Sequence, residues 1–243
     1  MGKLFVVGIG PGSYENMTMR AQQALAGCDI IVGYNVYVDL VKEHFADKEF
    51  LTTPMRREVE RCELALEKAA EGNTVAMICS GDAGVYGMSG LIEELAVKYP
   101  DVEIETVPGV SAVLSGAAVL GAALMHDFAV VSLSDWLTPW EKIEKRLAFA
   151  AQADFVMCFY NPSSHVRKDY LQKACDILLT VHSGDLICGY VQNIGREGER
   201  AVVLTLSELR DTQVDMFTTV FIGSTRTRVI NGKMVTPRGY RDV

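Results

Sequence analysis

The chain has 243 residues, 49% of them hydrophobic and 22% charged, which is typical of a well-cored globular protein of one large or two smaller domains. The formal net charge of −8 argues against general binding of nucleic acid, although a local basic patch stays open. No apolar run approaches the roughly 20 residues of a membrane span. The first residues show neither a signal-peptide nor a transit-peptide pattern, so a cytoplasmic protein is expected.

The spacing of the cysteines and histidines argues against a redox protein and against a metalloprotein. The six cysteines form no C-x-x-C pair, and several lie in apolar runs, which predicts buried thiols rather than a redox or zinc motif. The four histidines show no metal-ligand spacing, so no protein-bound metal is predicted.

In the first half, apolar β-branched runs alternate with longer amphipathic stretches. Strands are predicted at residues 3–9, 29–34, 74–79 and 102–107. An apolar stripe of Val59, Cys62, Leu66 and Ala69 predicts a helix over 56–71, and a second helix should run from about 87 to 99. This alternation predicts a mainly parallel sheet covered on both faces.

The second half begins with the small-residue stretch 113–125, which is predicted to be both a tightly packed helix and a connection between domains. Strands are expected at 128–133, 153–160 and 185–191, with a helix from about His165 to Val181. Short connections follow, and Asn231-Gly232 is a hairpin signal. The sequence therefore predicts two unequal α/β domains, 1–112 and 126–243, joined by 113–125, with a mixed second sheet.

Glycine-rich loops stand at the predicted strand ends. The first, GIGPGS (8–13), departs from the dinucleotide fingerprint G-x-G-x-x-G, because Pro11 deletes an amide donor and is expected to hold Gly10 extended. Four more loops follow strands, at 80–90, 107–112, 132–140 and 159–164. Any one of them can be a structural turn. Five together favour a ligand site, in which glycine permits close backbone approach.

These loops resemble the signature segments of the tetrapyrrole methylase family: GIGPGS, SGDAGVYGM, PGVSA, FYNPSS and VDMFTTVFIG. GYNVYVDLVK, MRREVERC, LMHDFAVVSLSDWLTPWEKIEKR and the terminal TPRGY are most similar to the branch that methylates C17 of precorrin-3B or cobalt-factor III in cobalamin (vitamin B12) synthesis. The resemblance runs from Val6 to Tyr240. It departs from the family pattern at Ser13, where Asp is common, and at Ala83, where Pro is usual.

The resemblance implies a class III fold of two α/β domains, with S-adenosylmethionine in a cleft between them, and usually a homodimer. S-adenosylmethionine would donate the methyl group and leave as S-adenosylhomocysteine. Carried over segment by segment, the cofactor-binding positions are Pro11, Ser80, Gly81, Asp82, Val85, Ser111, Ala112, Tyr160 and Ile194.

Chemistry of this kind needs alignment of the methyl group and exclusion of water more than a nucleophile. The contraction of the ring that accompanies C17 methylation needs proton transfers, for which Asp82, Ser134 and Asp135 are catalytic candidates, together with Tyr160. Asp135 could instead cap the helix that follows it. His126-Asp127 is interpreted either as part of a site or as a hydrogen bond at the domain junction.

A precorrin substrate carries many carboxylates, so an acidic protein needs local cations to hold it. Arg56, Arg57 and Arg61 form one cluster and Arg167 with Lys168 another, and both are expected to border the substrate unless they are solvated helix faces.

Three alternatives stay open. One is a different precorrin methyltransferase of the same family. Another is an NAD-dependent oxidoreductase, which predicts an acidic residue at the end of the second strand, where Gly33 and Tyr34 stand. The third is a non-catalytic nucleotide-binding module. Whether the substrate already holds cobalt is also open.

Overall fold

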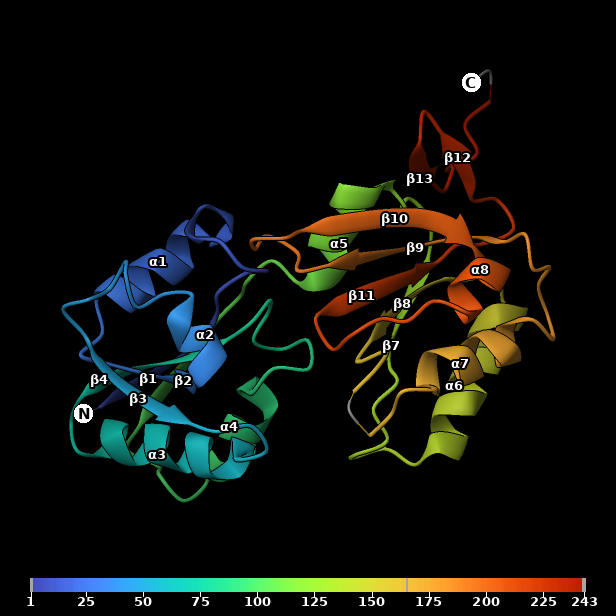
Figure 1. Ribbon diagram of the computed structural model, residues 1–243. Helices are drawn as coiled ribbons and strands as arrows, with labels where there is room; N and C mark the ends of the chain where they lie inside the picture. Colours follow the sequence, from blue (N-terminus) through green and yellow to red (C-terminus); the bar gives the residue numbers. More distant parts are fainter. Residues whose placement is uncertain (1, 165, 242–243) are drawn as a thin grey trace. The chain divides into compact units, whose positions relative to one another are not determined.

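The computed structural model describes residues 2–164 and 166–241. The chain divides into two compact units, with the boundary between Ala112 and Val113, and each unit is built around its own sheet (Figure 1). The α/β class predicted from the sequence is confirmed. The segment 113–125 falls within the second unit.

The first unit holds a five-stranded parallel sheet in the order β3-β2-β4-β1-β5. Its strands are β1 (Lys3–Gly8), β2 (Ile30–Tyr34), β3 (Glu49–Thr53), β4 (Thr74–Cys79) and β5 (Glu103–Val107). Because every strand runs the same way, their carboxyl ends meet at one edge, where loops leave the sheet.

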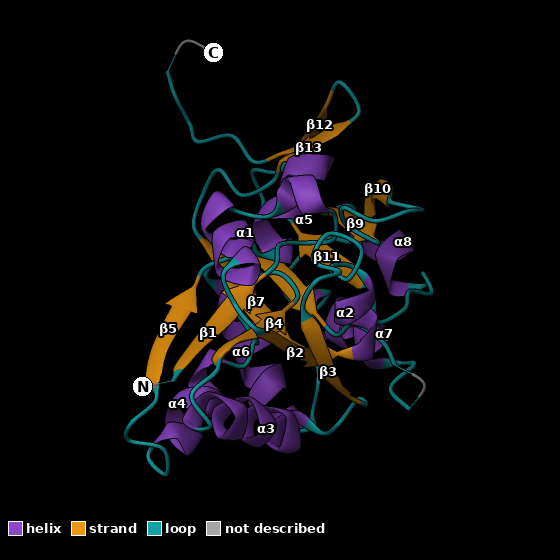
Figure 2. Ribbon diagram, turned by 90° about the vertical axis from the view of Figure 1, so that its left-hand side faces the viewer, coloured by secondary structure: helices purple, strands orange, loops and turns teal. Residues whose placement is uncertain are grey.

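Helices cover both faces of this sheet. They are α1 (Met19–Ala26), α2 (Asn35–Asp39), α3 (Glu58–Ala70) and α4 (Ser89–Ala96), with a 3-10 turn at Tyr14–Asn16. Alternation along β1 sends Phe5 and Val7 into a core with α1 and α2, and Leu4 and Val6 into a core with α3 and α4. Figures 1 and 2 show α3 and α4 together on one side of the sheet.

Two details of these helices differ from the prediction. Val59, expected on the buried stripe of α3, is 51% exposed, and Arg61 with Cys62 takes the buried side. The helix α4 runs from Ser89 to Ala96 rather than from about 87 to 99, and its start is delayed by a turn that the Ser89 amide closes by donating to the Ala83 carbonyl.

The second unit holds a mixed sheet in the order β10-β9-β11-β8-β7, in which only β7 and β8 run parallel. Its strands are β7 (Phe128–Ser132), β8 (Val156–Tyr160), β9 (Ile187–Gln192), β10 (Arg200–Thr205) and β11 (Thr218–Ile222). The antiparallel pairs follow from the short connections between the last strands. The predicted mixed sheet is confirmed.

One face of this sheet packs on α6 (Trp140–Gln152), α7 (Tyr170–Leu178) and α8 (Leu206–Arg210). The predicted start of α7 at His165 lies outside the described residues, and the helix runs only from Tyr170 to Leu178. The other face carries α5 (Ala112–Leu120). A Cβ at Gly116 would lie 2.8 Å from the Phe221 ring, so this small-residue helix is tightly packed as predicted.

A small third sheet joins β6 (Gly121–Ala122), β12 (Arg228–Ile230) and β13 (Lys233–Val235). The hairpin between β12 and β13 turns at Asn231 (φ 51°) and Gly232 (φ 74°), two consecutive left-handed residues, which confirms the Asn-Gly signal. Among the described residues, no helix is long and apolar enough to cross a membrane.

Candidate functional site

Three loops at the carboxyl edge of the first sheet are joined to one another through their backbones. The Gly10 amide donates to the Gly81 carbonyl at 3.0 Å, and the Gly81 amide donates back to the Gly10 carbonyl at 2.7 Å. A Cβ at Gly109 would lie 2.1 Å from the Gly81 carbonyl oxygen, and one at Gly8 would lie 2.6 Å from the Gly109 nitrogen. These glycines are therefore required where loop meets loop.

The expectation that Pro11 holds Gly10 extended is wrong. Gly10 has φ +76°, in the left-handed region that glycine enters without a Cβ penalty. A Cβ there would also lie 2.7 Å from the Asn16 carbonyl oxygen. The loop GIGPGS is thus packed closely on the neighbouring loops, and it does not present a series of exposed amides as a phosphate-binding loop does.

Asp82 organises the second and third loops. One carboxylate oxygen accepts from the Gly84 amide at 2.8 Å and the Val85 amide at 3.2 Å, and the other accepts from the Gly109 amide at 2.9 Å. Its oxygens are engaged by backbone donors of two loops. This geometry favours a positioning role for Asp82 over proton transfer.

The other predicted cofactor positions of the first unit lie on the same three loops. Pro11, Gly81 and Ser111 are buried, Ser80 and Ala112 are half-buried, and Val85 is 37% exposed. The structure therefore brings together, at one sheet edge, all the first-unit residues expected to bind the cofactor: Pro11, Ser80, Gly81, Asp82, Val85, Ser111 and Ala112.

The first arginine cluster follows β3, at the same edge. Arg56 is exposed with φ +66°, and Arg57 precedes α3, with a guanidinium nitrogen 3.4 Å from a Glu60 oxygen. Arg61 does not belong to an exposed face: it is 5% exposed and donates through Nη2 to the Pro54 carbonyl at 3.0 Å. Of the three arginines predicted either to border the substrate or to form a solvated helix face, two lie at the surface and Arg61 is buried.

In the second unit, Asp135 is the centre of a polar cluster. Its carboxylate accepts from Arg167 Nε at 2.5 Å and from the Tyr170 hydroxyl at 2.6 Å. The hydrogen bond from Tyr170, and then that from Arg167, lowers the pKa of Asp135, while Asp135 raises the pKa of Tyr170. Asp135 is held as an anion, which suits a clasp between two loops and not a proton donor.

The helix-cap alternative for Asp135 is wrong, because the N-cap residue of α6 is Pro139. Arg167 forms an ion pair with Asp135 through Nε, and its contact with a substrate stays a prediction. The ion pair between Asp135 and Arg167 joins the loop after β7 to the loop after β8. Lys168 is exposed beside them.

The remaining predicted residues of the second unit lie on separate elements. The Ser134 hydroxyl accepts from the Trp136 amide at 3.4 Å, and the Tyr160 hydroxyl accepts from the Val113 amide at 3.2 Å. Ile194 is buried, with its terminal methyl 3.0 Å from where a Gly116 Cβ would lie.

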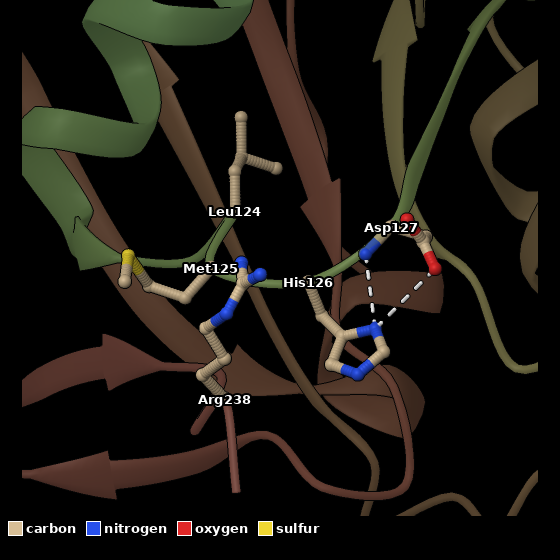
Figure 3. Close-up of a pocket in the computed structure, with 5 residues that line it drawn as sticks. All are labelled: Leu124, Met125, His126, Asp127 and Arg238. Carbon is tan, nitrogen blue, oxygen red and sulfur yellow. Dashed lines mark hydrogen bonds and ion pairs between the residues drawn. The ribbon is translucent and has the colours of Figure 1, made fainter. Parts of the chain in front are cut away.

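His126 and Asp127 line an open hollow of about 400 Å³ together with Leu124, Met125 and Arg238 (Figure 3). The Asp127 amide donates to His126 Nδ1 at 3.0 Å, a local bond between neighbours in sequence within the second unit, and a hydrogen bond at the domain junction stays a prediction. Within residues 2–164 and 166–241, no group of three His, Cys, Asp or Glu side chains could hold a metal ion.

Two residues that hydrogen-bond within these loops were missed by the sequence reasoning. Tyr170 completes the Asp135 cluster, and Asn161, with φ 54°, donates through its amide to the Ser132 hydroxyl at 3.0 Å. The Asn-Pro pair in FYNPSS is a turn signal that could have identified Asn161 as left-handed. Nothing local in the sequence marks Tyr170.

The protein is a two-unit α/β protein with one parallel and one mixed sheet. Its interlocked loops lie at the carboxyl edge of the parallel sheet, where α/β proteins of this kind bind small molecules. Residues 3–210 match the Tetrapyrrole (Corrin/Porphyrin) Methylases, and the chain belongs to this family. The family resemblance expected from the sequence is confirmed.

Relatives match the chain nearly end to end. It is 49% identical over 238 residues to a probable cobalt-factor III C(17)-methyltransferase of Salmonella typhimurium, covering 98% of this chain and 99% of that one. It is 39% identical to a precorrin-3B C(17)-methyltransferase of a Sinorhizobium species, covering 98% and 97%. The crystal structure of the methyltransferase CobJ is similar with a TM-score of 0.89 and 35% identity, covering 98% of this chain and 100% of that one.

Proposed function

We propose that this protein is an S-adenosylmethionine-dependent methyltransferase that methylates C17 of cobalt-factor III or precorrin-3B, with ring contraction, in cobalamin biosynthesis. The observation that carries the proposal is the 49% identity, over 98% of this chain, to a relative named for that reaction. The interlocked loops at the carboxyl edge of the first sheet supply the kind of site that such an enzyme needs.

The proposed cofactor contacts are Pro11, Ser80, Gly81, Val85, Ser111 and Ala112 of the first unit, and Tyr160 and Ile194 of the second. S-adenosylmethionine supplies an electrophilic methyl group whose bond to sulfur breaks as a carbon–carbon bond forms. The chain's contribution is alignment and exclusion of water, which together can lower a barrier by about 7–11 kcal/mol at best. The backbone-to-backbone packing of Gly8, Gly81 and Gly109 supports this role, because it makes the wall of the site rigid.

Ring contraction also needs groups that transfer protons, and the hydrogen bonds of the predicted residues narrow the choice among them. Asp82 and Asp135 are both engaged by protein donors, which leaves the hydroxyls of Ser134 and Tyr160 as the candidates from the predicted set that can move a proton. Asp82 and Asp135 would position the loops that carry the site.

The proposal also includes a cytoplasmic homodimer. Six buried cysteines without disulfides support a reducing compartment. Sedimentation equilibrium tests the dimer: a single species of twice the 26.6 kDa chain mass is expected.

Isothermal calorimetry with S-adenosylmethionine, S-adenosylhomocysteine, NAD and ATP tests the cofactor. We expect the first two to bind and the last two not to bind. Binding of NAD alone would favour the oxidoreductase, and binding without turnover would favour a nucleotide-binding module.

Turnover is then measured with methyl-labelled S-adenosylmethionine and parallel samples of cobalt-factor III and precorrin-3B. Label recovered at C17 of a contracted ring is the expected product, and the faster substrate decides whether cobalt is already present. Label at another carbon would indicate a different precorrin methyltransferase of the same family.

A further inference from the structure

Arg61 is a buried cation without an anionic partner. The residue is 5% exposed, and the one hydrogen bond of its side chain runs from Nη2 to the Pro54 carbonyl. Its Nε is buried without a hydrogen-bond partner, and no carboxylate of the described chain lies within 4.0 Å of the guanidinium. A buried charge is costly unless it is paired, so this side chain calls for an anion that the described residues do not provide.

The turn above Arg61 has the features of an anion site. Thr53, at the end of β3, carries a second buried polar atom without a partner, its Oγ1. The 13-residue helix α3 then begins after Arg57, which makes no side-chain cap. The amides at that end are therefore available to an anion, and the helix dipole favours negative charge there. Arg56 adds a cation in a strained, left-handed conformation, which is common at binding sites.

Arg61 has acidic residues on its own helix and an aromatic ring on a neighbouring strand. On its own helix, Glu58 and Glu60 lie in the first turn, and Glu60 faces Arg57 at 3.4 Å. From the neighbouring elements, the ring of Tyr34 lies with its centroid 5.8 Å from the guanidinium carbon. Burial raises the pKa of the Cys79 thiol to about 11, and the charge of Arg61 opposes that rise. Cys62, next to Arg61 on α3, packs in the same core cluster as Cys79, the residue directly before the loop that begins at Ser80.

We propose that residues 54–57 and the first turn of α3, with Arg61 beneath them, bind a carboxylate side chain of the tetrapyrrole substrate. Arg56 and Arg57 would meet the carboxylate at the surface. Arg61 supplies buried positive charge and, by holding the Pro54 carbonyl inward, fixes the turn. The inference rests on the proposed function, since a precorrin carries many acetate and propionate groups and the turn shares a sheet edge with the loops assigned to the cofactor.

The test measures porphyrin binding without any cofactor. Uroporphyrin III, a stable octacarboxylate tetrapyrrole, is titrated with the full chain while its fluorescence is followed, at low and at high salt. Arg61→Met removes the buried charge but keeps an unbranched apolar side chain. Arg146→Met, at an exposed position of α6, removes an equal charge elsewhere and is the matched control.

We expect Arg61→Met to raise the uroporphyrin dissociation constant by about tenfold, as loss of a charged partner does, and to flatten its salt dependence. Arg146→Met should change neither, and S-adenosylmethionine binding should be unchanged in both variants. Should Arg61→Met fail to fold, Arg61→Lys serves instead, because it keeps the charge but loses the fork geometry, and a smaller rise is expected.

Wild-type uroporphyrin affinity in Arg61→Met would overturn the inference. So would an equal loss of S-adenosylmethionine binding, which would assign the turn to the cofactor carboxylate or to general folding. Failure of the proposed function is distinguishable, because it would appear as a wild-type chain that binds no S-adenosylmethionine, whatever the porphyrin titration gives.

Discussion

At the scale of single residues, the carboxylates of this protein serve mainly to hold loops. Asp82 accepts from Gly109, 27 positions further along the chain, and Asp135 accepts from Arg167, 32 positions away. Both aspartates follow strands, where a sequence motif suggests catalysis. Their geometry instead favours a positioning role, because each oxygen is already engaged by a donor of the protein.

Replacing Asp82 by alanine should therefore loosen two loops at once. We expect the free energy of unfolding to fall by about 1–2 kcal/mol, since loss of an acceptor leaves amides without their partner. The dissociation constant of S-adenosylmethionine should rise in parallel. Chemical denaturation and calorimetry measure the two effects.

Amide hydrogen exchange separates this account from a direct contact. Faster exchange at Gly84, Val85 and Gly109 is expected in Asp82→Ala, because these amides lose their acceptor. The exposed Asp101, changed to alanine, is the control. Weaker cofactor binding with unchanged exchange would contradict the positioning role.

The hydrogen bonds of Asp135 predict that the stability of the protein depends on pH through this residue. Its pKa is lowered in the folded protein, mainly by Tyr170, so folding favours the ionised form. The resulting stabilisation is complete above the unfolded pKa of about 3.9 and is lost as the pH falls through the lower, folded pKa. The stability difference between wild type and Asp135→Asn should thus be present at neutral pH and shrink below that value.

Urea unfolding over a range of acidic pH measures this difference. Tyr170→Phe should lose part of the same stabilisation, because it removes the hydrogen bond that contributes most to the lowered pKa of Asp135. A difference that stays constant with pH would mean that the charge of Asp135 contributes nothing to stability.

At the scale of elements, α5 shows what small residues do in a helix. Gly116 faces the fully buried Phe221, and Leu120 lies against Gly189 of β9, so helix and sheet each present a glycine to a large side chain of the other. The close approach depends on both glycines, because an added Cβ at either would lie less than 3.0 Å from its neighbour.

Gly116→Ala should accordingly destabilise the protein by about 1–3 kcal/mol through overpacking. Gly90 of α4 is the matched control, since a Cβ there meets nothing within 4 Å. At that position alanine should stabilise the protein by about 0.4–1 kcal/mol by restricting the unfolded chain. Thermal or urea unfolding of the two variants gives the sign of each effect, and stabilisation by Gly116→Ala would contradict the packing argument.

The sequence predicted elements best where local pattern and tertiary environment agree. Residues 74–79, an apolar β-branched run, form β4 with the predicted bounds. The edge strand β3 was missed because EFLTT is short, polar and only partly buried. The helix α1 was missed because its buried stripe is Ala21, Ala24 and Leu25, whose alanines give a weak signal.

The features of the candidate site also divide into those that the sequence predicted and those that it did not. Its loops were predicted because glycine and strand ends are local features. The burial of Arg61 and the partners of Asp135 were not, because they depend on residues that the fold brings from elsewhere in the chain.

At the scale of the whole molecule, each unit has its own core. Two clusters fill the two faces of the first sheet, and one large cluster fills the helical face of the second. The six cysteines are all free and buried, three in each unit: Cys28, Cys62 and Cys79 in the first, and Cys158, Cys175 and Cys188 in the second. Burial raises the pKa of every one of them, for example to about 12 for Cys62 and for Cys175.

Because the thiolate is the reactive form and each thiol is sheltered, none of the six should react quickly with a thiol reagent in the native protein. Separate cores predict separate unfolding, so raising urea should release the thiols in two groups of three rather than all at once. Pulse labelling followed by peptide mass spectrometry identifies which thiols react at each concentration, and a sample in guanidinium provides the fully reactive reference. Release of all six over one transition would show that the two units unfold as a single cooperative body, and rapid labelling without denaturant would show that a core opens easily.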